Sequence, residues 1–221
     1  MACKFLEKFS EPEKLSGPIA IFYNLLPVKM LKPIYQRIAK TLPLENKGIL
    51  IDIGTGPGNL AQLIAQKYPN LKVIGIDLSE TMIKIANKNK RNLTNLEFKI
   101  MDGNNLEFKN NSIDYIISTL AFHHWKTPIK VLNEIYRVLK IGGGVWIYDG
   151  YSEATDEDIG KNLRCPLGLR IPRFLIRKLF STHSFSEKDY KENIQPLINK
   201  SDFKDILFER EGITIKIELR K

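Results

Sequence analysis

The residues with the clearest chemical potential form a glycine-rich segment, IDIGTGPG, at positions 51–58. Gly54, Gly56 and Gly58 lack a Cβ atom where an apolar strand turns into a helix, so a ligand can lie against the backbone there. The start of that helix offers unpaired N–H groups and the positive end of the helix dipole, which suit a carboxylate or a phosphate. The segment therefore predicts a binding site for a small ligand that carries an anionic group.

The spacing of the glycines favours an amino-acid-bearing nucleoside over a dinucleotide. The dinucleotide fingerprint places its third glycine three residues after the second, and Asn59 holds that position here. Asp52 lies in an otherwise apolar strand, where its burial is costly without a cationic or hydrogen-bonding partner. An amino group is such a partner, whereas a pyrophosphate is repelled. Asp77 ends the next apolar strand, where a carboxylate binds ribose hydroxyls; its alternative role is to cap the following helix.

A cluster of aromatic and imidazole side chains, FHHW, follows the fourth apolar strand, beside the switch point where parallel sheets bind ligands. His123 and His124 are candidates for a general base, because imidazole titrates near neutral pH. Neighbours in an extended segment point to opposite sides, so one imidazole is expected to face the site. The alternative is that both are structural and that Phe122 and Trp125 shape the substrate cavity. Tyr151, after the fifth strand, is a further candidate for the wall of this cavity.

Alternating strand and helix patterns position these residues. Short, nearly continuous apolar runs predict strands covered on both faces. They lie at 49–53, 73–77, 113–117 and 145–148. Residues 96–100 alternate between apolar and charged and predict a strand at a sheet edge. Five alternations of this kind predict parallel strands joined by helical crossovers, with the glycines at 142–144 ending the last helix.

The two ends of the chain depart from this alternation. Residues 1–45 carry helical patterns that Pro27 and Pro33 are expected to break. A helix near 186–199 precedes strands at 203–210 and 213–219, which Glu211-Gly212 joins as a hairpin. The predicted fold is α/β: a doubly wound, mostly parallel seven-stranded, Rossmann-like sheet that ends in an antiparallel hairpin. We expect a single domain, 1–221, with parts at 1–45 (cap), 48–150 (cofactor core), 151–185 (lid) and 186–221 (terminal helix and hairpin).

Five motifs in this order, IDIGTGPG, GIDLS, IMDGNN, FHHW and RVLKIGGG, together resemble the class I S-adenosylmethionine-dependent methyltransferase family. The likeness is greatest to its small-molecule branch, which includes quinone-biosynthesis methyltransferases. It is close over residues 48–150 and looser over the C-terminal helix and hairpin. The resemblance implies that the cofactor is S-adenosyl-L-methionine and that a methyl group passes to a small-molecule acceptor by in-line displacement.

The resemblance also implies a set of cofactor-binding residues. They are Tyr23, Asp52, Gly54, Thr55, Gly56, Gly58, Asp77, Leu78, Met82, Asp102, Gly103, Asn104, Ser118 and Thr119. Gly54, Thr55 and Gly56 correspond to residues that contact the methionine part of the cofactor, and Asp52 corresponds to a residue that supports it. Asp77 corresponds to the residue that binds the ribose. Asp102 corresponds to the acceptor of the adenine amino group. For Met82 the alternative is a place in the core, and for Asp102-Gly103 it is a simple turn.

The formal net charge of +9 raises the alternative of an RNA or protein methyltransferase. The excess is spread along the chain, and no NPPY-type tetrapeptide stands near the fourth strand, so we do not expect a nucleic-acid substrate. The basic and apolar stretch at 164–178 suits a lid helix or, alternatively, contact with an anionic substrate or membrane surface. A third class is a protein that binds S-adenosylmethionine without catalysis.

Two cysteines, Cys3 and Cys165, have no metal-ligand spacing, and we expect no metal site. The N-terminal residues are charged where a secretory signal is apolar, and no apolar run is long enough to span a bilayer. The sequence therefore predicts a cytoplasmic protein. It leaves the acceptor, the acceptor atom and the oligomeric state open.

Overall fold

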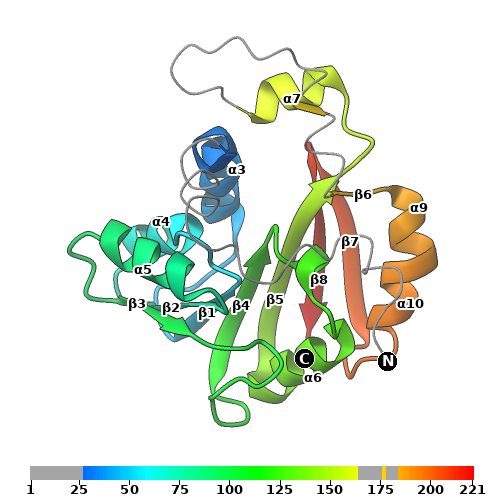
Figure 1. The fold of residues 1–221 in the computed structure, drawn as a ribbon. Coiled ribbons are helices and arrows are strands. Elements are labelled where there is room, and N and C mark those ends of the chain that lie inside the picture. The colour runs from blue at the N-terminus through cyan, green and yellow to red at the C-terminus, as the bar shows by residue number, and fades with distance from the viewer. Residues whose placement is uncertain (1–26, 164–175, 178–183) are drawn as a thin grey trace.

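A twisted sheet forms the centre of the molecule in the computed structural model, which describes residues 27–163, 176–177 and 184–221 (Figure 1). Its strands are β1 (Ile49–Ile53), β2 (Lys72–Asp77), β3 (Leu96–Ile100), β4 (Ile113–Thr119), β5 (Leu139–Tyr151), β6 (Ser184–Phe185), β7 (Asp205–Glu211) and β8 (Thr214–Arg220). Seven lie in the order β3-β2-β1-β4-β5-β8-β7, and β6 pairs with the end of β5. Only the pairs of β8, with β5 and with β7, are antiparallel. The predicted mixed α/β sheet with a C-terminal hairpin is confirmed; the short β6 was not predicted.

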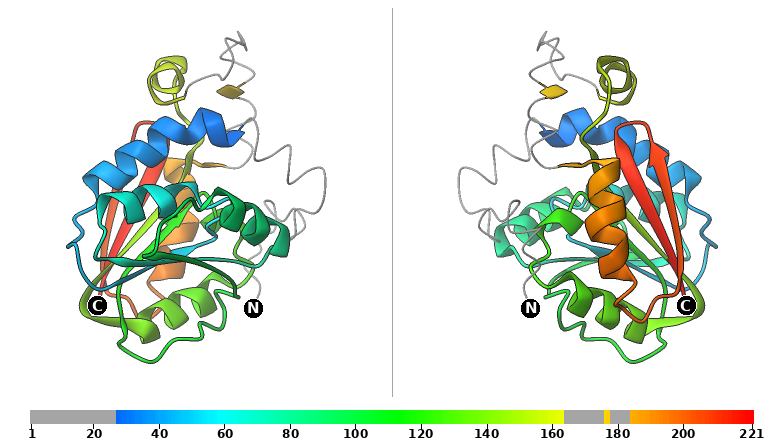
Figure 2. Two further views of the ribbon diagram at one scale, coloured as in Figure 1. Left: turned by 90° about the vertical axis from the view of Figure 1, so that its left-hand side faces the viewer. Right: turned by 90° about the vertical axis from the view of Figure 1, so that its right-hand side faces the viewer.

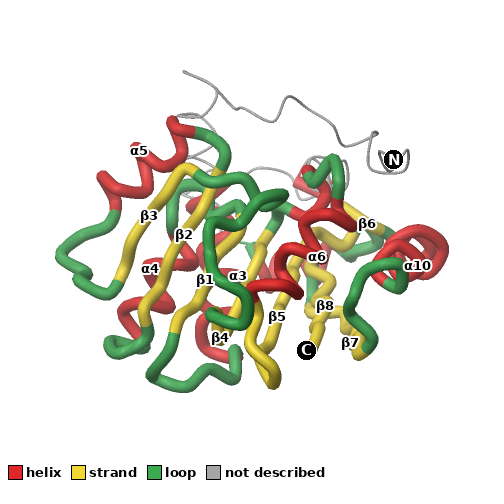
Figure 3. The backbone as a smooth tube through the Cα atoms, turned by 90° about the horizontal axis from the view of Figure 1, so that it is seen from below, coloured by secondary structure: helices red, strands yellow, loops and turns green. Residues whose placement is uncertain are grey.

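Helices cover both faces of the sheet (Figures 2 and 3). They are α3 (Pro27–Thr41), α4 (Asn59–Lys67), α5 (Glu80–Asn89), α6 (Pro128–Val138), α7 (Asp156–Asn162), α9 (Glu187–Asp189) and α10 (Gln195–Ile198), with short turns of other helix types at Phe122–His124 (η1) and Tyr190–Ile194 (η3). The first three pack on one face, and α6 and the continuous α9–η3–α10 segment pack on the other. No helix in the described part of the chain is both long and apolar enough to cross a membrane.

Each strand's burial follows from its place in the sheet. The central strand β1 has neighbours on both sides and buries Leu50 and Ile51 completely, as its unbroken apolar sequence predicts. The strand β3 lies at the edge, as its alternating sequence predicts, and its Glu97 pairs with Lys72 and Lys99 in partial exposure. Parallel strands end at one edge of the sheet, and the turns that follow β1, β2 and β4 therefore meet there.

The predicted break of the N-terminal helix at Pro33 and the predicted start of the fifth strand are wrong. The helix α3 begins at Pro27 and continues through Pro33 without a break. A proline within a helix loses one backbone hydrogen bond, and here complete burial of Ile34 and Ile38 offsets that loss. Helix α6 ends at Val138, as predicted, but β5 already begins at Leu139 and not after the glycines. The glycines lie inside β5, where its register with β4 shifts, as in a β-bulge.

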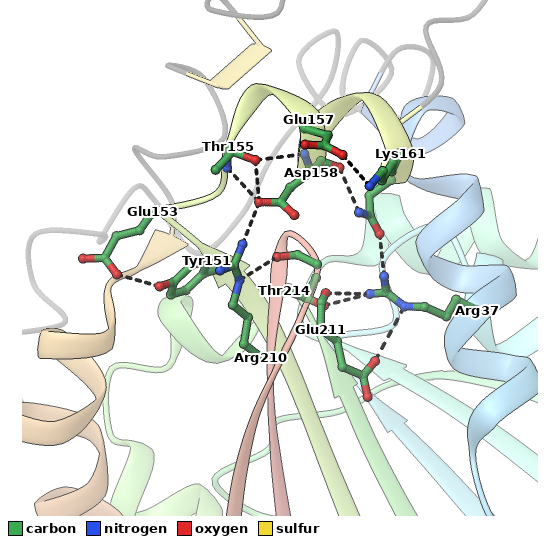
Figure 4. Close-up of polar contacts among 12 residues, drawn as sticks. Arg37, Tyr151, Glu153, Thr155, Glu157, Asp158, Lys161, Arg210, Glu211 and Thr214 are labelled. Atoms are coloured by element: carbon green, nitrogen blue, oxygen red, sulfur yellow. Dashed lines mark hydrogen bonds and ion pairs between the residues drawn. The ribbon is translucent and has the colours of Figure 1, made fainter.

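A half-buried guanidinium fastens α3 to the C-terminal hairpin (Figure 4). Arg37 of α3 donates to the Glu211 backbone oxygen at 3.0 Å and to Thr214 Oγ1 at 2.9 Å, both at the β7–β8 turn. It also donates to Asn162 Oδ1 of α7 at 2.5 Å. One side chain thus joins three segments that are distant in sequence.

A second contact fastens α7 to the same hairpin. Arg210 Nη2 lies 2.6 Å from Asp158 Oδ2, and the Arg210 guanidinium lies 4.7 Å from the centre of the Tyr151 ring. The Tyr151 hydroxyl donates to Glu153 at 2.6 Å (Figure 4). The hairpin turn therefore holds both segments that flank the end of β5.

We predict that Arg37→Ala lowers the free energy of unfolding by roughly 1.5–3 kcal/mol, the scale of hydrogen bonds from a charged donor. Denaturant unfolding measures the loss. Lys161→Ala is the matched control, because Lys161 forms an exposed pair with Glu157, and such pairs contribute less than about 1 kcal/mol. Equal effects of the two substitutions would contradict the role of Arg37.

Candidate functional site

A cavity of about 290 Å³ opens where the turns after β1, β2 and β4 meet. The sequence-predicted residues that line it are Asp52, Gly54, Thr55, Gly56, Asp77, Leu78, Met82, Asp102, Gly103, Asn104, Thr119, His124 and Trp125. These residues come from four separate turns of the chain. Their assembly in one cavity follows from the parallel sheet, which brings the carboxyl ends of its strands to one edge.

The buried carboxylate of Asp52 dominates the electrostatics of this cavity. Asp52 is only 2% exposed, and its Oδ2 accepts a hydrogen bond from Thr55 Oγ1 at 2.7 Å. Burial is the main cause that raises the pKa of Asp52 to about 7; the Thr55 bond opposes the rise, and the nearby Asp77 adds to it. A cation in the cavity would favour the ionised form of this carboxyl.

Asp77 organises the turn that follows β1. Its Oδ2 accepts from the Gly56 backbone N–H at 2.9 Å and its Oδ1 from the Ser79 N–H at 2.8 Å. Burial raises the pKa of Asp77, and these two hydrogen bonds oppose the rise. Each carboxylate oxygen still has a second lone pair, so Asp77 can also accept hydrogen bonds from a ligand.

The glycine turn after β1 is shaped by close contact on one side and open space on the other. Gly54 has φ +72°, and a Cβ atom there would lie 2.5 Å from the Ala121 Cβ, in the turn after β4. Gly56 has φ +52°, but a Cβ atom there would meet nothing within 4 Å. Gly54 thus locks two turns together, while the Gly56 backbone borders the open cavity.

Two polar groups in the cavity wall lack a partner among the described residues. Asn59 Nδ2, at the first residue of α4, and Thr119 Oγ1, at the end of β4, are both buried without a hydrogen bond. Leaving such a group unpaired costs roughly 1–3 kcal/mol. The Asn59 amide is a donor beside the unpaired N–H groups that begin α4, and together they suit a ligand carboxylate.

The opposite end of the cavity is apolar with one exposed carboxylate. Leu78 is 39% exposed, an unusual exposure for a leucine, and Met82 is buried beside it in the cavity wall. Asp102 Oδ1 accepts from the backbone and side-chain nitrogens of Asn104 at 2.8 and 2.9 Å. Thr127 in turn bonds to Asn104 Oδ1, which anchors this loop at the start of α6. A flat heteroaromatic ring fits an apolar rim of this kind.

The turn after β4 separates the two imidazoles. Leu120 has φ +55°, a strained conformation for a leucine, and its N–H donates to the Tyr148 oxygen of β5 at 2.8 Å. Beyond it, His124 lines the cavity, whereas His123 is buried against Asp149 of β5. The two neighbouring side chains therefore have different surroundings.

Several predicted site residues lie away from the cavity wall. Gly58 packs against Phe98, Phe122 is fully buried against Trp125 and Phe185, and Ser118 Oγ donates to the Ile53 oxygen. Tyr151 contacts Glu153 and Arg210 at the hairpin. Tyr23 lies outside the described residues.

Sequence reasoning missed several lining residues. Leu31 and Tyr35 reach the cavity from α3, and Leu120 and Lys126 flank His124. The helical spacing of Leu31 and Tyr35 was visible, but it indicated only one face of a helix. Asn59 was noticed as the residue that replaces a glycine, not as a donor in its own right.

Comparison with known proteins assigns the chain to a family. The family model described as "Methyltransferase domain" matches residues 44–202, and the chain belongs to this family. The fold is that of the S-adenosylmethionine-dependent methyltransferases. One such protein from Aquifex aeolicus has a TM-score of 0.60 at 20% identity, covering 99% of this chain and 98% of that one. Another, assigned to the same class in Methanococcus maripaludis, has a TM-score of 0.71 at 24% identity, covering 92% and 90%.

Curated relatives are similar over part of their length. The chain is 32% identical over 126 residues to a demethylmenaquinone methyltransferase of Thermotoga maritima, covering 57% of this chain and 54% of the relative. It is 28% identical over 130 residues to a malonyl-[acyl-carrier protein] O-methyltransferase of a Marinomonas species, covering 59% and 48%. The matched region thus spans about half the length of these relatives.

The raised pKa of Asp52 predicts how stability depends on pH. The folded protein holds a proton on Asp52 up to about pH 7, whereas the unfolded chain releases it near pH 4. The stabilisation from this proton is therefore fully present below about pH 4 and is lost progressively as pH rises to about 7. We predict that Asp52→Asn raises the free energy of unfolding at pH 8 by roughly 2–4 kcal/mol.

At pH 5 the difference between the two proteins should be smaller, roughly 1–1.5 kcal/mol, because only the tenfold preference of the unfolded chain for the ionised form then acts. Denaturant unfolding of the ligand-free proteins at pH 5 and 8 measures both values. The same difference in unfolding free energy between the two proteins at pH 5 and at pH 8 would contradict the account.

Proposed function

We propose that the chain is an enzyme that binds S-adenosyl-L-methionine in this cavity and transfers its methyl group to a small-molecule acceptor. The observation that carries the proposal is that the β1–α4 turn has one group that requires a cation and another that requires a hydrogen-bond acceptor. Asp52 is a buried carboxylate that a cation stabilises, and Asn59 Nδ2 is a buried donor without an acceptor in the part of the chain that the structure describes. An amino acid's ammonium and carboxylate groups satisfy both demands at once.

The remaining cavity residues suit the rest of the cofactor. Asp77 accepts from the ribose hydroxyls, while Leu78 and Met82 contact the adenine ring. Asp102 accepts from the adenine amino group. Gly54, Thr55 and Gly56 lie along the methionine part, and Thr119 donates its hydroxyl to the cofactor. Each assignment uses a group that the fold already places at the cavity wall.

When bound, the cofactor supplies a methyl group on a positively charged sulfur, which an acceptor's lone pair can displace in line. The protein's tasks are then to align the two molecules and to exclude water, and alignment alone contributes roughly 7–11 kcal/mol in well-oriented reactions. Leu31 and Tyr35 of α3 cover the cavity on one side. This cover supports the cap role proposed for the N-terminal part of the chain.

The proposed acceptor class rests on the relatives. The names of the Thermotoga and Marinomonas proteins state small-molecule or carrier-bound acyl acceptors. The net charge of +9 and a 30% identical tRNA (carboxymethyluridine(34)-5-O)-methyltransferase of Saccharomyces cerevisiae favour RNA as the second candidate. The tetrapeptide associated with amino-group methylation in nucleic acid is absent, and the cavity wall holds apolar and aromatic side chains beside His124.

We predict that S-adenosyl-L-methionine and S-adenosyl-L-homocysteine each bind at one molecule per chain in calorimetry, and that NAD does not. Asp77→Ala should weaken both affinities by roughly 1–3 kcal/mol, the scale for a lost charge-assisted hydrogen bond. Asp205→Ala is the control, because Asp205 lies on the edge strand β7, away from the cavity. Unchanged affinity in folded Asp77→Ala protein would remove Asp77 from the site.

Transfer of a labelled methyl group distinguishes the candidate functions. The labelled cofactor is offered with hydroquinones, small carboxylic acids, phosphoethanolamine and bulk tRNA in separate reactions. Label in a small molecule supports the proposal, and label in tRNA alone replaces it with the second candidate. Stoichiometric cofactor binding with no transfer to cell-extract small molecules, protein or RNA would indicate a protein that binds without catalysis.

A further inference from the structure

A second buried carboxylate, Asp149, has no part in the cofactor site. It lies near the end of β5 and is completely buried. Its Oδ2 accepts from the His123 backbone N–H at 3.0 Å, and its Oδ1 accepts from the Gly150 N–H at 2.8 Å. His123 Nδ1 lies 2.8 Å from Oδ1 and 3.0 Å from Oδ2. The two side chains form a buried carboxylate–imidazole pair.

The chemistry of this pair exceeds what a turn requires. An asparagine side-chain oxygen could accept from one of the two backbone N–H groups without the cost of burying a charge, but a carboxylate accepts from both and from His123 Nδ1 as well. A carboxylate can only accept, so it requires a proton on His123 Nδ1. Asp149 therefore fixes both the orientation of the His123 ring and the ring nitrogen that carries the proton, as carboxylates do for functional histidines.

The pair is continuous with the cavity wall. The centres of the His123 and His124 rings are 3.9 Å apart, and His124 lines the cavity. The same turn is fastened to β5 a second time by the bond from the Leu120 N–H to the Tyr148 oxygen. The His124 ring thus packs against the ring that Asp149 holds.

We propose that Asp149 and His123 are positioning residues for methyl transfer, which together hold His124 toward the acceptor as its general base. The proposal rests on the proposed function and adds residues to it. In the step, the acceptor's lone pair bonds to the methyl carbon and the carbon–sulfur bond breaks, its electron pair passing to sulfur. His124 takes the acceptor's proton and becomes an imidazolium.

The variant Asp149→Asn separates this role from a structural one. Its side-chain oxygen can still accept from the His123 N–H, whereas the bond from the Gly150 N–H is lost. Its amide nitrogen can only donate, which moves the His123 proton from Nδ1 to Nε2. Asp114→Asn is the matched control: Asp114 also accepts from a backbone N–H, that of Ile49, but at the opposite end of the sheet.

Nitrogen–proton NMR of the imidazoles tests the coupling without an acceptor. The chain has three histidines, which His123→Gln and His124→Gln assign. We expect a proton on His123 Nδ1 in the unsubstituted protein, its loss in Asp149→Asn, and a concurrent shift of the His124 signals. Asp114→Asn should leave both rings unchanged. His124 signals that stay in place in Asp149→Asn would overturn the proposal.

Adding S-adenosylhomocysteine to the same samples separates this inference from the proposed function. Imidazole signals of the unsubstituted protein that do not shift when S-adenosylhomocysteine is added would contradict the proposed function. Binding that survives in Asp149→Asn with a moved His124 supports both. In methyl transfer, Asp149→Asn should lower kcat about tenfold or more with little change in the KM for the cofactor. In the His124→Gln variant, the Asp149→Asn substitution should lower kcat little further. Fully additive effects of the two substitutions on kcat would show a merely structural role for Asp149.

Discussion

The Asp52 carboxylate is buried at the end of the central strand, and the surroundings of the site follow from that burial. Its carboxylate accepts a hydrogen bond from the Thr55 hydroxyl, and its pKa is raised to about 7. An ionised carboxylate in such a place destabilises the free protein, and a bound cation reverses that effect. The folded protein is thus less stable when this site is empty than when a cation occupies it. Folded stability and ligand affinity are opposed at this residue, as is common at functional sites.

The positions of the other site groups depend on three turns that hold one another. Gly54 lies against Ala121, so the turn after β1 and the turn after β4 pack directly on each other. Asp77 of β2 holds the Gly56 N–H, and Asp149 of β5 holds His123. Carboxylates from neighbouring strands thus fix the backbone of both turns. Farther out, Arg37 and Arg210 fasten α3 and α7 to the hairpin, which joins the cover of the cavity to the sheet.

Local patterns in the sequence were enough to predict the strands, their mostly parallel order and the carboxyl-edge site. Apolar runs, the glycine turn and Asp77 carry that information within a few residues. Pro33 wrongly predicted a break in the helix, and Gly142 wrongly predicted a later start of the fifth strand. Both predictions failed because burial of α3 and the bulge in β5 depend on partners elsewhere in the chain. Asn59, Tyr35 and the Asp149–His123 pair were missed for the same reason: a residue's neighbours across the sheet are set by packing and do not appear in its local sequence.

The central claim is that a cation of the cofactor compensates the charge of Asp52, and counting protons tests it most directly. Near pH 7 the free protein holds about half a proton on Asp52, and a bound cation releases it. Titration calorimetry with S-adenosyl-L-methionine at pH 7, in two buffers of different ionisation enthalpy, gives the number of protons released. The account predicts that the unsubstituted protein releases about half a proton more than Asp52→Asn does. Equal release by the two proteins, or a net uptake that Asp52→Asn abolishes, would contradict it.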